Sequence, residues 1–90
     1  MNALDRKLLL FYLRLTPRQR EVAQLTSQGL SNCEIAEAMC IAPSVVAGHL
    51  TNIYSELATT DLPQASQSKR YAVIRLLSGF FERNPDLQVW

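Results

Sequence analysis

Residues 31–57 read SNCEIAEAMCIAPSVVAGHLTNIYSEL, and this stretch decides the fold that we predict for the chain. Ser31 and Glu34 have the spacing of a capping box, in which the serine oxygen accepts a backbone N–H bond and the glutamate bonds back. A helix is therefore expected to begin here. Its apolar face follows at helical spacing: Ile35, Ala36 and Met39. Residues 40–42 break this helix, and Pro43 begins the next, because its fixed φ suits the first helical position.

The second helix of this stretch has two contrasting faces. Apolar residues form a stripe on one side: Val46, Leu50, Ile53 and Leu57. The opposite side carries small residues: Ser44, Ala47, Gly48, Thr51 and Ser55. This pattern predicts that the helix packs on a core through its stripe and leaves the small side chains exposed. Two helices joined by so short a turn predict a helix-turn-helix.

The segment before this pair predicts another helix with defined ends. Thr16 and Gln19 form a second capping box, and Pro17 occupies the first helical position. The helix is expected to run to Gln28 and to stop at Gly29, which adopts left-handed backbone without a steric penalty. Its inward residues are expected to be Val22, Leu25 and Thr26.

Residues 2–14, NALDRKLLLFYLR, predict an additional helix at the N-terminus. Asn2 suits the N-cap, and Asp5 lies in the first turn, where the helix dipole favours an acidic residue. Apolar residues cover much of this helix: Leu4, Leu8 and Phe11 on one face, with Leu9, Leu10 and Leu13 beside it. Either the core of the domain or a second subunit has to cover so much aliphatic surface.

After Leu57 the sequence ATTDLPQASQSKR is polar and predicts a loop, or a helix start near Pro63. A helix is then expected over residues 67–82, with Asn84-Pro85 ending it. Its apolar residues are Tyr71, Val73, Ile74, Leu76, Leu77, Phe80 and Phe81. We expect Trp90 to dock on the domain. The predicted fold is all-α and a single domain, 1–90, with an extra N-terminal helix (1–15), a helix-turn-helix core (16–57) and a loop with a C-terminal apolar helix (58–90).

The core sequence resembles a known DNA-binding family. The matching residues are LTPRQREV at 15–22, GLSN at 29–32, EIA at 34–36, Ile41, Val46, His49-Leu50 and Asn52-Ile53-Tyr54. Together they are similar to the LuxR-type (GerE-like) helix-turn-helix domain. The resemblance implies a four-helix module, with residues 58–70 as an insertion, in a small transcription regulator. It also implies that the helix beginning at Pro43 enters the DNA major groove. Region 4 of sigma factors shares part of this pattern, but the His-Leu-x-Asn-Ile-Tyr run favours the LuxR type.

The charges differ from those usual in that family. No Lys or Arg occurs between Arg20 and Lys69, whereas five acidic residues fall in that interval. The LuxR type usually carries other residues at several positions: lysine at Cys33, Ala47 and Glu56, threonine at Val45 and a capping serine at Ala42. DNA affinity rests largely on the neutralisation of phosphates by cations. Each missing cation therefore lowers the slope of log affinity against log salt by about one.

Two hypotheses about function follow. In the first, the protein binds duplex DNA through uncharged groups of the second helix: Ser44, Ala47, Gly48, His49, Thr51 and Asn52. Cations elsewhere in the chain would then contact phosphates: Arg18, Arg20, Lys69, Arg70 and Arg75. In the second, the small uncharged face packs against protein, and the chain acts as a partner or antagonist of another transcription regulator. A homodimer through the N- and C-terminal helices would suit paired DNA half-sites.

Composition and sequence motifs argue against a membrane protein, a secreted protein or an enzyme. Ninety residues with 48% hydrophobic content suit one small domain. A net charge of +1 gives the protein as a whole no electrostatic attraction to nucleic acid or membrane. No apolar run approaches the roughly 20 residues of a membrane span, and the N-terminus does not read as a secretory signal. We therefore expect an intracellular, cytoplasmic protein that is not an enzyme and needs no cofactor, since no catalytic constellation is present.

The two cysteines are expected to be reduced thiols. Cys33 and Cys40 lie about 10 Å apart by helical rise, which exceeds what an internal disulfide tolerates. They are either inert or form an intermolecular disulfide as a redox switch. Together with His49 they are three possible metal ligands, but their spacing is not that of a zinc site, so no metal site is predicted.

Overall fold

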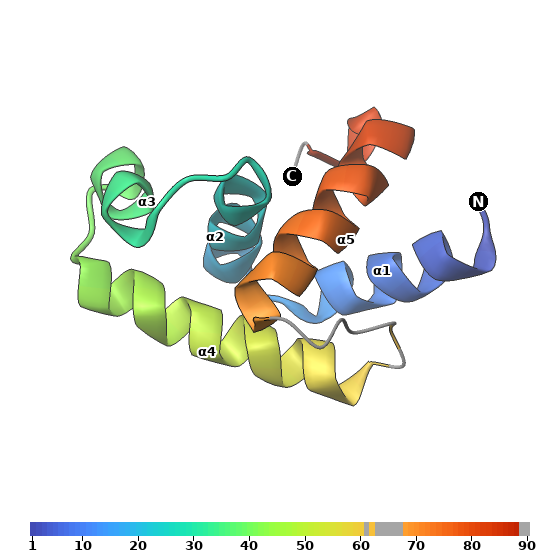
Figure 1. Cartoon of the computed structure of the whole chain (residues 1–90), viewed down its shortest axis with the longest axis horizontal. Helices are drawn as coiled ribbons and strands as arrows, with labels where there is room; N and C mark the ends of the chain where they lie inside the picture. The colour runs from blue at the N-terminus through green and yellow to red at the C-terminus, as the bar shows by residue number, and fades with distance from the viewer. Residues whose placement is uncertain (61, 63–67, 89–90) are drawn as a thin grey trace.

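The computed structural model describes residues 1–60, 62 and 68–88, and these residues form helices without any strand. In chain order the elements are α1 (Ala3–Arg14), α2 (Pro17–Ser27), α3 (Asn32–Met39), α4 (Pro43–Thr59), α5 (Lys69–Arg83) and the 3₁₀ helix η1 (Pro85–Gln88). The all-α prediction is confirmed for this part of the chain (Figure 1). The predicted helix start at Pro63 and the docking of Trp90 lie outside the described residues.

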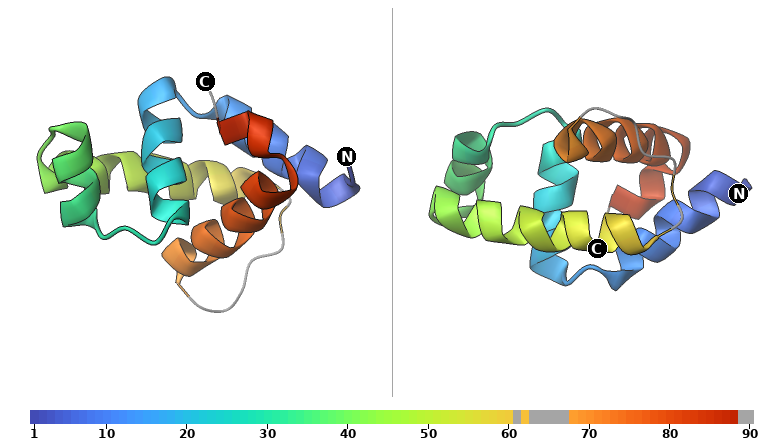
Figure 2. Two further views of the ribbon diagram at one scale, coloured as in Figure 1. Left: turned by 90° about the horizontal axis from the view of Figure 1, so that it is seen from above. Right: turned by 60° about the horizontal axis from the view of Figure 1, so that its bottom comes forward.

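The helices are arranged around α2, which packs mainly on α4 and α5 (Figure 1). α3 and α1 lie at opposite ends of the molecule, and α4 runs along one side (Figure 2). α3 and α4 meet at 108°, within the roughly 90–120° of a helix-turn-helix. No single helix of the described segments is long and apolar enough to cross a membrane, although α3 and α4 taken together pass that test by length and composition.

The apolar stripe predicted for α4 faces the core. Val46, Leu50, Ile53 and Leu57 are each at most 4% exposed. From the other side, Phe11 and Phe80 are fully buried and join α1 and α5 to the same core. Tyr12, Phe80 and Phe81 form a ring cluster with centroids 5.4 to 6.5 Å apart. The extra N-terminal helix is thus an integral part of the fold.

The predicted N-caps of α1, α2 and α3 are confirmed, whereas α5 begins at Lys69 and ends at Arg83, and the predicted range was 67–82. Thr16 Oγ1 accepts from the Gln19 N–H at 3.2 Å, and the Thr16 N–H donates back to Gln19 Oε1 at 3.0 Å. The Ser31–Glu34 box has the same two bonds, at 3.2 and 2.8 Å. In α1, the Asp5 N–H donates to Asn2 Oδ1 at 2.7 Å. Each cap satisfies backbone donors that the first turn of a helix leaves without partners.

Helix ends differ slightly from the predictions. α2 ends at Ser27 with Gln28 as its cap, so the prediction was one residue too long, and Gly29 follows with φ +90° as expected. α4 continues two residues beyond Leu57 to Thr59. The end of α3 was not foreseen: Cys40 caps it in left-handed backbone, φ 56°, and the Ile41 N–H reaches back to the Ala36 carbonyl at 3.0 Å. This Schellman-type stop usually takes glycine, because other residues are disfavoured there.

The core of the domain covers only part of the apolar surface of α1. Leu8 and Phe11 are fully buried in the core, but Leu10 is 57% and Leu13 is 55% exposed. In α5, Tyr71, one of the apolar residues predicted for that helix, is 44% exposed. The core explains one face of α1 and leaves a leucine pair on the other.

Asp5 has a larger role than helix capping. Its carboxylate is only 4% exposed and accepts from Arg83 Nη2 at 2.6 Å, from Arg83 Nε at 3.1 Å and from Asn84 Nδ2 at 3.1 Å. The hydrogen bonds from Arg83 lower the pKa of the Asp5 carboxyl below its ordinary 3.8, outweighing the opposing effect of burial. The start of α1 is thereby fastened to the end of α5.

Stability is expected to depend on pH through this carboxylate. A lowered folded-state pKa contributes stability that is fully present above the ordinary pKa of 3.8 and is lost as pH falls through the folded value. Urea unfolding measured across the acidic range should show that loss in the wild type and a flatter profile in Asp5→Asn, which is also less stable at neutral pH. Glu37→Gln serves as the control, because it removes one carboxylate from the exposed surface of α3. Equal acid profiles for Asp5→Asn and wild type would contradict the assignment.

Candidate nucleic-acid interface

The exposed face of α4 is a smooth surface of small uncharged side chains. Ser44, Ala47, Gly48, Thr51 and Asn52 are all exposed. A Cβ added at Gly48 would meet nothing within 4 Å, so this glycine leaves open space in front of the helix. The buried stripe on the other side fixes the rotation of α4, and this rotation turns the small residues toward solvent.

Two further residues of α4 complete this face. Val45 is 45% exposed and adds an apolar side chain in the first turn, whereas His49 is half-buried beside the core stripe. In the sequence, Val45 stands out only as a departure from the family pattern. Its offset of one residue from the buried Val46 places it outside the apolar stripe, on the solvent side of the helix. Thr51 Oγ1 donates to the Ala47 carbonyl at 3.1 Å, so its hydroxyl proton is used within the helix. The exposed oxygen can still accept hydrogen bonds.

The cations predicted to contact phosphates divide into two groups. Arg20 donates to the Tyr12 and Leu13 carbonyls at 3.2 and 3.1 Å, which caps the end of α1. Arg70 donates to Asn32 Oδ1 at 2.6 Å and also to the Leu30 carbonyl. Both guanidinium groups are therefore engaged within the fold.

The remaining candidate cations lie at the surface. Arg18 is half-exposed and pairs with Glu21 at 3.0 Å, a surface contact of small energetic value. Lys69 and Arg75 are exposed on α5 and form no ion pair with the described residues. Of the five candidate cations, these three remain at the surface.

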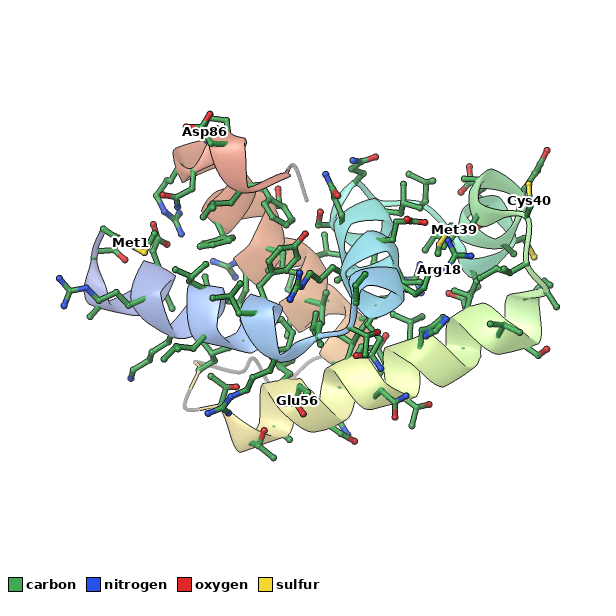
Figure 3. The ribbon with its side chains drawn as sticks, turned by 180° about the vertical axis from the view of Figure 1, so that it is seen from behind. Met1, Arg18, Met39, Cys40, Glu56 and Asp86 are labelled. Carbon is green, nitrogen blue, oxygen red and sulfur yellow. The ribbon has the colours of Figure 1, made fainter. Side chains whose placement is uncertain are left out.

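Charge is strongly segregated in the molecule. All nine Lys and Arg residues lie on α1, the first turn of α2 or α5. The ionised groups of α3 and α4 are glutamates only: Glu34, Glu37 and Glu56. In Figure 3, Cys40 marks the turn of the helix-turn-helix at one end, and Met1 lies at the other. The face of α4 therefore offers hydrogen bonds and close approach without a phosphate-binding charge.

Both cysteines are exposed at the ends of α3, Cys33 in its first turn and Cys40 at its cap. This exposure leaves each thiol accessible to a second molecule. The intermolecular disulfide suggested by the sequence stays a prediction.

Sequence comparison matches this architecture to a family. The family described as "Bacterial regulatory proteins, luxR family" matches residues 13–68, more than half of the chain. The chain belongs to the luxR family. The matched region contains α2, α3 and α4, whereas α5 lies beyond it and most of α1 lies before it. The resemblance inferred from the sequence is therefore confirmed.

Several curated regulators are similar to this luxR-family chain. The tetrathionate response regulatory protein TtrR of Salmonella typhimurium is 39% identical over 59 residues, which cover 66% of this chain and 29% of that protein. The transcriptional regulatory protein LnrK of Bacillus subtilis is 45% identical over 62 residues, covering 68% and 28%. The response regulator protein VraR of Staphylococcus aureus is 43% identical over 54 residues, covering 60% and 26%. The chain spans less than a third of the length of these relatives, and no solved structure matches it.

Proposed function

We propose that this luxR-family chain is a transcription regulator that binds duplex DNA by inserting the exposed face of α4 into the major groove. The observation that carries the proposal is the exposed face itself. Ser44, Ala47, Gly48 and Asn52 project from a helix that the core stripe holds in place, at the end of the molecule away from α1 (Figure 1). A convex helix with small side chains can approach base edges closely.

The chemistry of this face suits base contacts better than phosphate contacts. Asn52 carries an amide, which can bond adenine in bidentate fashion, and Ser44 carries a hydroxyl, which can bond several bases. Val45 and Ala47 present methyl groups that can contact the thymine methyl. We therefore expect few phosphate contacts, supplied from the rim by Arg18, with Lys69 and Arg75 as further candidates.

Fluorescence anisotropy with a mixed-sequence duplex, titrated across salt, tests the proposal. The wild type should bind with a shallow slope of log affinity against log salt, because each phosphate contact contributes about 0.9 to that slope. Ala47→Lys places a cation at the centre of the face and should raise the slope by about one unit and tighten binding at low salt. The exposed position of Ala47 makes this substitution compatible with the fold.

The same titration distinguishes the second candidate function. α3 and α4 carry no Lys or Arg. The cores of protein–protein interfaces are likewise depleted of charged residues, so this feature favours a surface that binds protein. Binding that appears only in Ala47→Lys, with none for the wild type at low salt, would remove the DNA proposal. The chain would then be a helix-turn-helix protein that contacts another transcription regulator.

We further propose that the chain forms a homodimer through the outer face of α1. Leu10 and Leu13 are more than half exposed and adjacent on that helix, whereas α5 buries most of its apolar residues and exposes Tyr71 alone among its large ones. Light scattering coupled to size-exclusion chromatography should give twice the monomer mass for the wild type and the monomer mass for Leu10→Glu. Tyr71→Glu should remain dimeric. A wild-type monomer at high protein concentration would overturn this proposal.

A further inference from the structure

Arg70 connects segments of the chain that are far apart in the sequence. It lies in the first turn of α5, yet its guanidinium donates to Asn32 Oδ1 at 2.6 Å and to the Leu30 carbonyl, on the connection between α2 and α3. These two hydrogen bonds, and those of Asp5 with Arg83 and Asn84, join residues that are far apart in the sequence. α5 is thus tied at one end to the helix-turn-helix and at the other to α1.

Arg70 also reaches the helix that carries the candidate interface. Burial raises the pKa of the Tyr54 hydroxyl, and the Arg70 guanidinium opposes that shift through its charge and a side-chain hydrogen bond. Tyr54 belongs to α4, one helical turn beyond the buried Leu50. The Arg70 guanidinium therefore bonds to the start of α3 and also lies close to Tyr54 in the C-terminal half of α4.

α3 needs such support. It has only eight residues, and an isolated helix of that length is unstable in water. It packs on α4 through Ile35, Ala36 and Met39, and a capping box satisfies its first turn. Arg70 supplies a contact of another kind, because its planar fork fixes the position of Leu30 and Asn32 relative to α5.

We propose that Arg70 is a positioning residue that holds α3, and with it the exposed face of α4, in the arrangement that binds DNA. The inference rests on the proposed function and assigns Arg70 a role other than phosphate contact. We call the hydrogen bonds from Arg70 to Asn32 and Leu30 the tether. Without it, the arrangement of α3 and α4 that binds DNA is populated for a smaller fraction of the time. Apparent affinity falls in proportion to that fraction.

Arg70→Met and Arg70→Lys, compared with Arg14→Met, test this role. Arg70→Met is expected to weaken duplex binding about tenfold, which corresponds to a competent fraction near one tenth, while the salt slope stays unchanged. Arg70→Lys keeps the charge but not the fork, so it should bind as weakly as Arg70→Met. Arg14 lies exposed in the last turn of α1, outside the proposed DNA interface, and its replacement controls for the loss of one positive charge. Asn32→Ala removes a single acceptor and is a milder variant if Arg70→Met does not fold.

Native-state hydrogen exchange supplies a readout that does not require DNA. Exchange of the α3 amides is expected to rise about tenfold in Arg70→Met and to stay unchanged in Arg14→Met. A salt slope reduced by about one unit, rescue by Arg70→Lys and unchanged exchange would identify Arg70 as a phosphate contact and overturn the inference. If the wild type binds no duplex, the proposed function fails. Faster α3 exchange in Arg70→Met would then still support the tether, and unchanged exchange would refute it.

Discussion

Gly48→Glu is expected to weaken duplex binding by about a hundredfold while the protein stays folded. The substitution places a negative charge at the centre of the α4 face, where it would meet the phosphates and base acceptors of the groove. Like charges brought together in an interface cost several kcal/mol, and every 1.4 kcal/mol is a tenfold change in affinity. Nothing lies within 4 Å of a Cβ at this position, so the fold accommodates the side chain. Replacing glycine within a helix also removes a penalty of about 0.5–1 kcal/mol.

Ser78→Glu is the matched control for Gly48→Glu. Ser78 is exposed on α5, so this variant changes the net charge by the same amount away from α4. Anisotropy at one salt concentration should show near-wild-type affinity for Ser78→Glu and the large loss for Gly48→Glu. Urea unfolding of both variants confirms that the fold is intact. Equal affinities for the two variants would show that the face of α4 does not approach DNA.

Phe80→Ala is expected to cost about 3–5 kcal/mol of the free energy of unfolding. The Phe80 ring is fully buried and lies 6.5 Å from the Tyr12 ring and 5.5 Å from the Phe81 ring, measured between centroids. Its removal leaves a cavity where α1 and α5 meet, and the surrounding helices relax only partly into it. Domains of this size have about 5–15 kcal/mol in total, so this single change removes a large share of the stability.

Tyr71→Ala provides the comparison for Phe80→Ala. It removes an aromatic ring from the same helix, but Tyr71 is 44% exposed, so the expected loss is at most about 1 kcal/mol. Urea unfolding followed by far-ultraviolet circular dichroism measures both variants. Similar losses for the two would contradict the placement of the core between α1 and α5.

The local features of the fold could be predicted because they depend on short-range patterns. The two capping boxes at Thr16 and Ser31 and the stop at Gly29 follow from residues three or fewer positions apart. The stripe of α4 follows from its helical period, and all four predicted residues are buried. The left-handed Cys40 escaped prediction because its conformation is imposed by the turn and not by its own preference.

Contacts between distant segments could not be predicted in this way. Asp5 looked like a favourable first-turn residue, and only the fold brings Arg83 and Asn84 onto its carboxylate. Arg70 and Arg20 looked like surface cations, whereas the structure places their guanidinium groups on backbone carbonyls of other segments. Charge counting along the chain cannot separate such tethering cations from those that remain at the surface, because the distinction arises from tertiary packing.

The measurement that tests the central claim most directly is an amide NMR titration of the labelled protein with a mixed-sequence duplex. We predict that the largest shift changes occur within residues 44–52 on α4, with smaller changes around Arg18 and Lys69 at the rim. Changes confined to α1, or none at all when duplex is in excess at low salt, would contradict the proposal that the exposed face of α4 enters the groove.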